Sequence, residues 1–189
     1  YANSLTNSGD LPPVANFDGG AKIYVWVGGG VHWFPDATTF SAFGYSFSSV
    51  ADLPGWIQGK VAQGGDMKTV VKRQGTSTIY YMQNGKKSHI SNNTAYTTLG
   101  SPVYSSLPTV TLAQAYIDSF PIGPPILTAN TFAKAYDTGG YGIWNGTNYQ
   151  SMNASAAQGT GISPDYTTSS TALNQLPKDS SSINKLVKD

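Results

Sequence analysis

Short apolar runs recur at a fixed distance along the chain. Runs rich in β-branched and aromatic residues span 23–27 and 79–83, and each is followed by a glycine turn and a predicted return strand, at 31–34 or 87–90. The second turn is Asn84-Gly85, a strong hairpin signal because both central residues need positive φ. The pattern therefore predicts two β-hairpins that lie 56 residues apart.

Each hairpin is followed by residues typical of a short helix. Asp36 and Asn92 are suited to cap a helix N-terminus, and apolar or aromatic residues lie three positions apart after each of them. Gly44 and Gly100 stand where such a helix would end. An apolar stretch also precedes each hairpin, so each unit is predicted to be a three-stranded meander with short helical turns.

The repeat divides the chain into units of about 56 residues, a period typical of repeat architectures. A third copy is indicated because Ala133-Lys134-Ala135-Tyr136 lies 112 positions after Ala21-Lys22-Ile23-Tyr24. The predicted segments are 1–20, the tail of a preceding repeat or a closing strand, followed by repeats at 21–76, 77–132 and a divergent 133–189.

Such small units cannot bury both faces of a sheet alone, so they must stack or close. The predicted fold is mainly β. It is either a small propeller-like or three-fold ring, in which 183–189 pairs with 22–27, or a segment of a longer repeat array.

Composition narrows the function classes. The 189 residues include 11 Lys and Arg and 10 acidic residues, for a formal net charge of +1, and no cysteine. Nucleic-acid binding needs a face rich in Arg and Lys, so no nucleic-acid partner is expected. Disulfide scaffolds and thiolate metal sites are excluded. No run approaches the roughly 18 apolar residues that span a bilayer, so membrane insertion is not expected.

The second copy resembles a repeat of large extracellular bacterial proteins. It reads Thr78-Ile79-Tyr80-Tyr81, then Asn84-Gly85-Lys86-Lys87-Ser88-His89-Ile90, then Tyr96 and Leu99-Gly100. The related repeat has a V-Y-x-x-x-x-G-K-K-x-x-I-P hairpin, a helix ending in F-x-x-L-G-Y and a P-x-G-P tail. Copy one departs at the turn, and copy three departs through its middle. The resemblance implies a non-catalytic surface module, set near cell-wall-processing or adhesive domains, with no catalytic residues.

The residues themselves offer no convincing catalytic or metal-binding set. His32 and His89 lie one position out of register in the two hairpins, which favours sheet residues on opposite faces over a catalytic base. A glycosidase needs two carboxylates, one with a raised pKa, whereas the acidic residues here are all Asp and mostly suit turns or caps. A calcium loop with a closing Glu is absent. We therefore expect no enzyme activity and no cofactor.

Aromatic side chains on the hairpins make a better case for binding. If Val25 faces the core, alternation places Tyr24 and Trp26 on an exposed platform, and flat rings with polar edges suit stacking on sugars. The alternative is that the rings are core residues. Lys86-Lys87 adds a weak basic point for phosphate or carboxylate groups. The candidate ligand-binding residues are Tyr24, Trp26, Trp33, Tyr80, Tyr81, Lys86, Lys87, Trp144 and Tyr149.

These features predict a non-catalytic module, extracellular or on a bacterial cell surface, that binds cell-wall glycan or another polysaccharide. The alternative is a structural protein, such as a surface-layer, filament or adhesin segment. Low charge and open strand edges would then favour pairing with copies of itself or with adjacent domains of a longer chain. A third hypothesis is an accessory domain of a cell-wall hydrolase.

Overall fold

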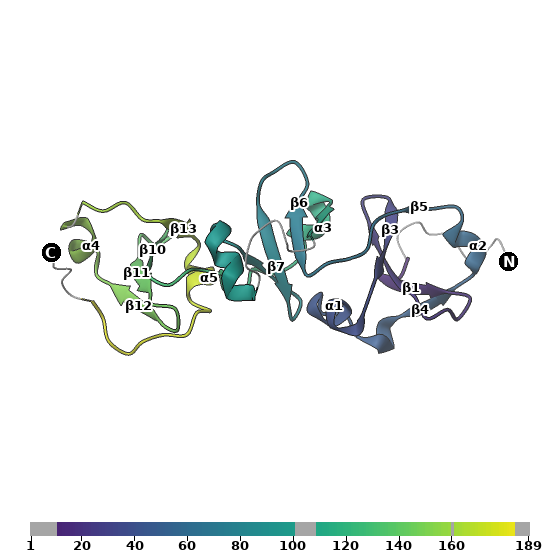
Figure 1. Ribbon diagram of the computed structural model, residues 1–189, viewed down its shortest axis with the longest axis horizontal. Coiled ribbons are helices and arrows are strands. Elements are labelled where there is room, and N and C mark those ends of the chain that lie inside the picture. The colour runs from purple at the N-terminus through teal and green to yellow at the C-terminus, as the bar shows by residue number, and fades with distance from the viewer. Residues whose placement is uncertain (1–10, 101–108, 160, 184–189) are drawn as a thin grey trace.

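The chain is mainly β and forms three separate sheets that lie in a row (Figure 1). The computed structural model describes residues 11–100, 109–159 and 161–183. None of the three sheets closes into a barrel. Among the described residues, no helix is long and apolar enough to cross a membrane.

The first sheet has five strands in the order β4-β1-β2-β3-β5. The strands are β1 (Val14–Phe17), β2 (Ile23–Val27), β3 (Gly30–Phe34), β4 (Ala51–Leu53) and β5 (Ala62–Gln63). Its helices are α1 (Ala37–Ala42), the 3-10 helix η2 (Phe47–Ser49) and α2 (Gly55–Gln58).

The second and third sheets have four strands each, in the orders β8-β7-β6-β9 and β12-β11-β10-β13. The second comprises β6 (Val70–Arg73), β7 (Ile79–Gln83), β8 (Lys86–His89) and β9 (Thr109–Leu112), with the 3-10 helix η3 (Asn93–Leu99) and α3 (Gln114–Asp118). The third comprises β10 (Thr131–Ala135), β11 (Tyr141–Trp144), β12 (Tyr149–Met152) and β13 (Tyr166–Thr168), with α4 (Ala154–Gly159) and α5 (Ser170–Leu173).

All three sheets share one chain path. Three antiparallel strands are followed by a helix, and a fourth strand then returns parallel to the first, as in β1 with β4, β6 with β9 and β10 with β13. After another short helix, the chain runs parallel to the third strand. That last pairing is β5 with β3 in the first sheet, Ile122 with Lys87 in the second and Lys178 with Tyr149 in the third. Both edges of each meander are therefore covered by the same unit.

The hairpins and caps predicted from the sequence are confirmed. Asn84 and Gly85 have φ of 51° and 70°, the positive values that their two-residue turn requires. The Asp36 carboxylate accepts a hydrogen bond of 2.6 Å from the Thr39 N–H, and Asn92 caps η3 in the same way.

The predicted register of the third copy is wrong for its first strands. In the structure, Phe132 of β10 takes the place that Val70 has in β6, so the offset between these first strands is 62 and not 56. Ala133–Ala135 therefore lies in the first strand of its sheet and not in the second. The final helix α5 still follows α3 by 56 positions. One constant offset cannot place both ends of this unit. The first strand of each sheet also starts before the segment boundaries at 21, 77 and 133, since β1 lies within 1–20.

Ring closure through β2 is not found in the described residues. β2 lies between β1 and β3 and has no free edge. Ile183 pairs with Met152 of its own sheet, and the rest of 183–189 lies outside the described residues. The first and third sheets occupy opposite ends of an elongated molecule (Figure 1).

The first two sheets share a hydrophobic core, whereas the third has its own. The shared cluster joins Val25 and Phe43 of the first unit to Met82 and Ile117 of the second, all at most 2% exposed. The Phe43 ring lies 5.7 Å from that of Phe120, across the junction. The third sheet is covered on its two faces by separate clusters. The junction between the second and third sheets therefore differs from the first junction, because no such shared cluster joins its described residues.

Candidate functional site

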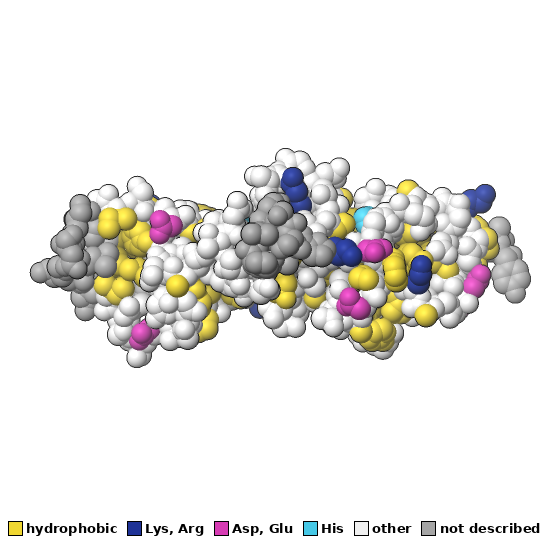
Figure 2. All heavy atoms as spheres, viewed as in Figure 1, with side chains coloured by type: hydrophobic (Ala, Val, Ile, Leu, Met, Phe, Trp, Pro, Cys, Tyr) yellow, Lys and Arg dark blue, Asp and Glu magenta, His cyan; other side chains and the backbone are white. Residues whose placement is uncertain are grey.

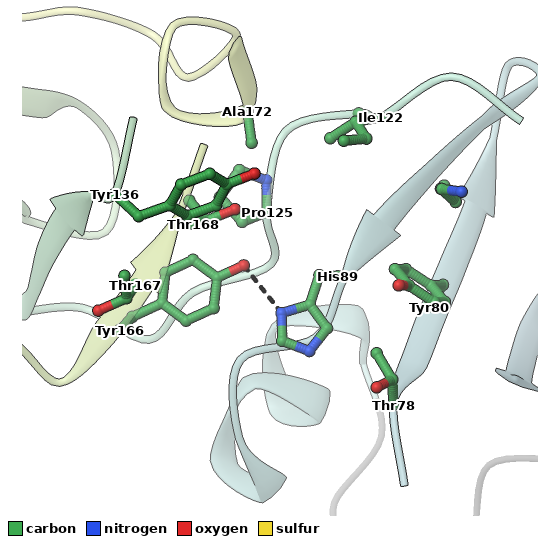
Figure 3. A pocket seen from close by; sticks show the side chains of 12 residues that line it. Thr78, Tyr80, His89, Ile122, Pro125, Tyr136, Tyr166, Thr167, Thr168 and Ala172 are labelled. Carbon is green, nitrogen blue, oxygen red and sulfur yellow. Dashed lines mark hydrogen bonds between the residues drawn. The ribbon is translucent and has the colours of Figure 1, made fainter. Parts of the chain in front are cut away.

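A cleft of about 360 Å³ lies at the junction of the second and third sheets. Strands β7 and β8 form one wall, the segment after α3 forms the floor, and β13 and α5 form the other wall. Tyr136 and Tyr166 project into it from the third unit, and Tyr80 and His89 face them from the second (Figure 3). The lining residues are Thr78, Tyr80, Lys87, His89, Ile122, Gly123, Pro125, Tyr136, Tyr166, Thr167, Thr168 and Ala172.

The two junctions differ at one position of the short helix that follows the returning strand. Tyr116 of α3 packs against Phe43, with 6.4 Å between ring centroids, and its hydroxyl lies 3.2 Å from that of Tyr45. The equivalent residue in α5, 56 positions later, is Ala172. Ala172 lines the cleft, so the second junction has a methyl group at the position where the first has a phenol ring.

A histidine and a tyrosine tie the two walls together. Nδ1 of His89 lies 2.8 Å from the Tyr166 hydroxyl, and the two rings stack with centroids 5.5 Å apart (Figure 3). Burial lowers the pKa of His89 below its ordinary value and raises that of Tyr166 to about 12. Both side chains are therefore neutral at pH 7.

Tyr136 is the most accessible ring of the cleft. Its side chain is 67% exposed, and its backbone N–H donates to the Thr168 carbonyl at 2.9 Å. The next residue, Asp137, accepts hydrogen bonds from the N–H and hydroxyl of Ser170, and the backbone hydrogen bond is the main reason that the pKa of Asp137 lies below its ordinary value. The backbone beneath the ring is thus fixed while the ring stays open to solvent.

The charges beside the cleft are already paired. The Lys87 ammonium donates to the Ile117 carbonyl at 2.9 Å and lies 3.6 Å from the Asp118 carboxylate. Arg73 holds the same carboxylate through two hydrogen bonds, which keeps the pKa of Asp118 below its ordinary value. The basic point predicted at Lys86-Lys87 is therefore reduced to one residue, because the Lys87 side chain is buried. Lys86 remains exposed.

A polar clamp crosses the junction beside the cleft. The Lys86 ammonium donates to the Gln175 side chain at 2.8 Å, and the Gln175 amide donates to the Ile122 carbonyl at 2.7 Å. No buried apolar cluster spans this junction in the described part of the chain. Hydrogen bonds and the His89–Tyr166 pair hold the two units here.

The predicted binding residues are spread over all three sheets. Tyr80 and Lys87 line the cleft, and Lys86 lies beside it. The others are Tyr24 and Tyr149, which are buried in cores, and Trp26, Trp33, Tyr81 and Trp144, which are half-buried against different clusters.

The expected Tyr24–Trp26 platform is not exposed. Val25 does face the core shared with the second unit, but α2 and β4 cover the opposite face, where Tyr24 is 8% exposed and accepts a hydrogen bond from Gln58. The Trp33 ring is covered by the Lys22 ammonium, 4.4 Å from its centroid. The rings on the first hairpin are thus mainly packing residues.

The site predicted from the sequence did not include Tyr136 and Tyr166, which line the cleft, and interpreted His89 as an ordinary sheet residue. Tyr166 lies on β13, a three-residue strand in a Ser/Thr-rich stretch without alternation. Its approach to His89, 77 positions away, depends on how two units sit against each other. The one local signal for this cleft in the sequence was an aromatic residue, Tyr136, next to a turn.

We expect a pH effect at His89. Because the folded pKa lies below the unfolded value, the unfolded state binds more protons as the pH falls through about 6.5, so stability is lost on acidification. The melting temperature of the unmodified chain should fall between pH 7 and about 5. The fall should be smaller in His89→Gln than in the control variant His32→Gln. Calorimetry at constant ionic strength measures this, and equal slopes in both variants would contradict the assignment.

The described residues contain no group of three or more His, Cys, Asp or Glu able to hold a metal ion. Few charged side chains are visible on the face in Figure 2. The cleft thus combines neutral aromatic rings with hydroxyl and backbone hydrogen-bonding groups.

Comparisons with known proteins assign no family. No family model matches the chain, and no curated protein does. Among solved structures, it is similar to a chain in the periplasmic assembly of the ESX-5 inner membrane complex, with 12% identity and a TM-score of 0.26. The match covers all of this chain and 62% of that one. That likeness is too low to assign a fold or a function.

Proposed function

We propose that the chain is a non-catalytic module that binds neutral glycan in the cleft between its second and third sheets. The observation that carries this proposal is an exposed tyrosine, Tyr136, in a cleft of about 360 Å³. Beside it lies a second tyrosine, Tyr166, which stacks on His89. Such a volume is within the range of small-molecule sites, and rings with polar edges suit the apolar face and hydroxyl rim of a sugar.

Charge favours a neutral ligand over an acidic one. His89 is held neutral by burial, and Lys87 and Arg73 are both engaged by Asp118. Beside the cleft the Lys86 ammonium is exposed but already donates to Gln175, and a single exposed lysine gives an acidic polymer a weak, salt-sensitive attraction. Neutral wall polysaccharides, such as those built from N-acetylhexosamines, fit this surface better.

Catalysis has little support in this cleft. Its lining has no carboxylate among the described residues, and glycoside hydrolysis ordinarily uses two. The module would hold a polysaccharide and leave any bond cleavage to another domain. This is compatible with an accessory role beside a cell-wall hydrolase, and with an extracellular or cell-surface location in a bacterium.

The repeat supports the same proposal. We infer that the three sheets are three copies of one unit in an open row, because strand order and parallel returns are shared. A row presents one junction after another along its length, and an exposed aromatic ring, Tyr136, lines the opening at the second junction. An extended polymer could lie across such a row.

Loss of the Tyr136 ring should weaken binding. Aromatic stacking contributes about 1–1.5 kcal/mol, so Tyr136→Ala should raise the Kd for neutral wall oligosaccharides about tenfold. Isothermal titration against a panel of neutral and acidic wall glycans tests this. The matched control is Phe47→Ala, because Phe47 is 59% exposed and lies on the first unit. Equal effects of both substitutions, or preference for acidic glycans, would contradict the proposal.

A further inference from the structure

The two ends of the row present different apolar faces. At one end, the face of the first sheet under α2 carries Trp56, which is 62% exposed, with Leu53 and Val61 only partly buried beside it. We call this the head face. At the other end, the face of the third sheet under α4 carries Tyr141 and Ile143, both half-buried. We call this the tail face. Helices α2 and α4 lie at opposite ends in Figure 1.

The head face corresponds to a face that is covered inside the molecule. Leu112 pairs with Arg73 as Leu53 pairs with Phe17, so Leu53 and Leu112 are equivalent positions. Trp26 and Met82 are equivalent in the same way, 56 positions apart. Leu112 and Met82 are 1% and 0% exposed because the first unit packs on them, whereas Leu53 and Trp26 remain partly accessible.

The tail face likewise corresponds to a face that is covered inside the molecule. Ile143 pairs with Phe132 as Val25 pairs with Val14, which makes Ile143 the equivalent of Val25. Val25 is 1% exposed because the second unit covers it, and Ile143 is only half-buried. Within the chain, therefore, a tail-type face of one unit already packs against a head-type face of the next.

We propose that the head face of one copy docks on the tail face of a second copy, which repeats the packing of the first two units. The two faces differ, so the contact is heterologous and leaves a free head and a free tail on every assembly. Trp56 is suited to anchor the contact, since tryptophan is enriched among the residues that dominate binding energy. The net charge of +1 creates little repulsion between copies.

Two end variants test the polarity of this contact. Sedimentation equilibrium of the whole chain should show a mass that rises with concentration. Trp56→Ala and Ile143→Thr should each weaken association at least about tenfold. An equimolar mixture of the two should form one-to-one dimers and nothing larger, because each variant retains the face that the other lacks. The cleft variant Tyr136→Ala should associate like the unmodified chain, which separates this contact from glycan binding.

Other outcomes would overturn the proposal. The unmodified chain staying monomeric up to about 1 mM would show that the faces do not dock. A loss of association in Trp56→Ala alone, with Ile143→Thr unaffected, would show a head-to-head contact instead. Circular dichroism of each variant checks that it is folded; Trp56 is more than half exposed, and Ile143→Thr keeps a β-branched side chain in its strand, so folding should be retained.

Discussion

Replacing Phe43 with alanine is expected to destabilise the first two sheets together and to leave the third unchanged. The Phe43 side chain is 2% exposed and its ring contacts Phe34 in its own unit and Phe120 in the next. Removing a buried phenylalanine costs about 3–5 kcal/mol from lost burial and the cavity left behind. Because one cluster serves both sheets, both should lose that free energy of unfolding.

Hydrogen exchange read segment by segment measures this effect, since it reports the opening free energy of each region. The matched control is Phe132→Ala, a residue 6% exposed in a cluster that belongs to the third sheet. It should lower protection in the third sheet alone. If Phe43→Ala reduced protection in β10 and β11 as much as in β2 and β7, the separation of the two cores would be refuted.

Replacing Gly44 with alanine is expected to open the first junction. Gly44 has φ of +80°, and a Cβ there would lie 2.7 Å from the Cα of Gly85, the turn residue of the second hairpin. The Gly85 N–H donates to the Ala42 carbonyl at 3.0 Å, so the two backbones touch. The substitution adds a left-handed strain of about 1–2 kcal/mol to a steric cost of about 1–3 kcal/mol.

Gly100 provides the control for the steric part. It occupies the same position after η3, with φ of +77°, but a Cβ there meets no atom within 4 Å. Gly100→Ala should therefore show only the conformational cost. Denaturant unfolding of both variants gives the difference, and equal losses would mean that the Gly44–Gly85 contact does not limit the junction.

Local structure was predictable because it depends on nearby residues. The Asn84-Gly85 turn, the Asp36 cap and the strands at 23–27 and 79–83 follow from backbone preferences and short-range hydrogen bonds. The parallel returning strands were missed because they have only three or four residues and lie in polar stretches. Their stability comes from pairing with a strand distant in sequence, as in β13 with β10.

The site was predictable only in part for the same reason. Tyr80 and Lys87 were correctly placed on a hairpin, and both line the cleft. Tyr24 has the same position on the first hairpin, yet α2 covers it. Whether an aromatic ring on these strands is buried or exposed depends on what the neighbouring unit and the closing helix place over it. Alternation along one strand carries no information on that.

The central claim is that neutral glycan binds in the cleft of Tyr136, Tyr166 and His89. The most direct measurement is an NMR titration of the whole chain with the neutral wall oligosaccharide that binds most tightly, following backbone amides and the His89 ring. The account predicts that shifts concentrate at 78–89, 122–125, 136 and 166–172, on both sides of the junction. Shifts confined to the first sheet, or none at saturating sugar, would contradict it.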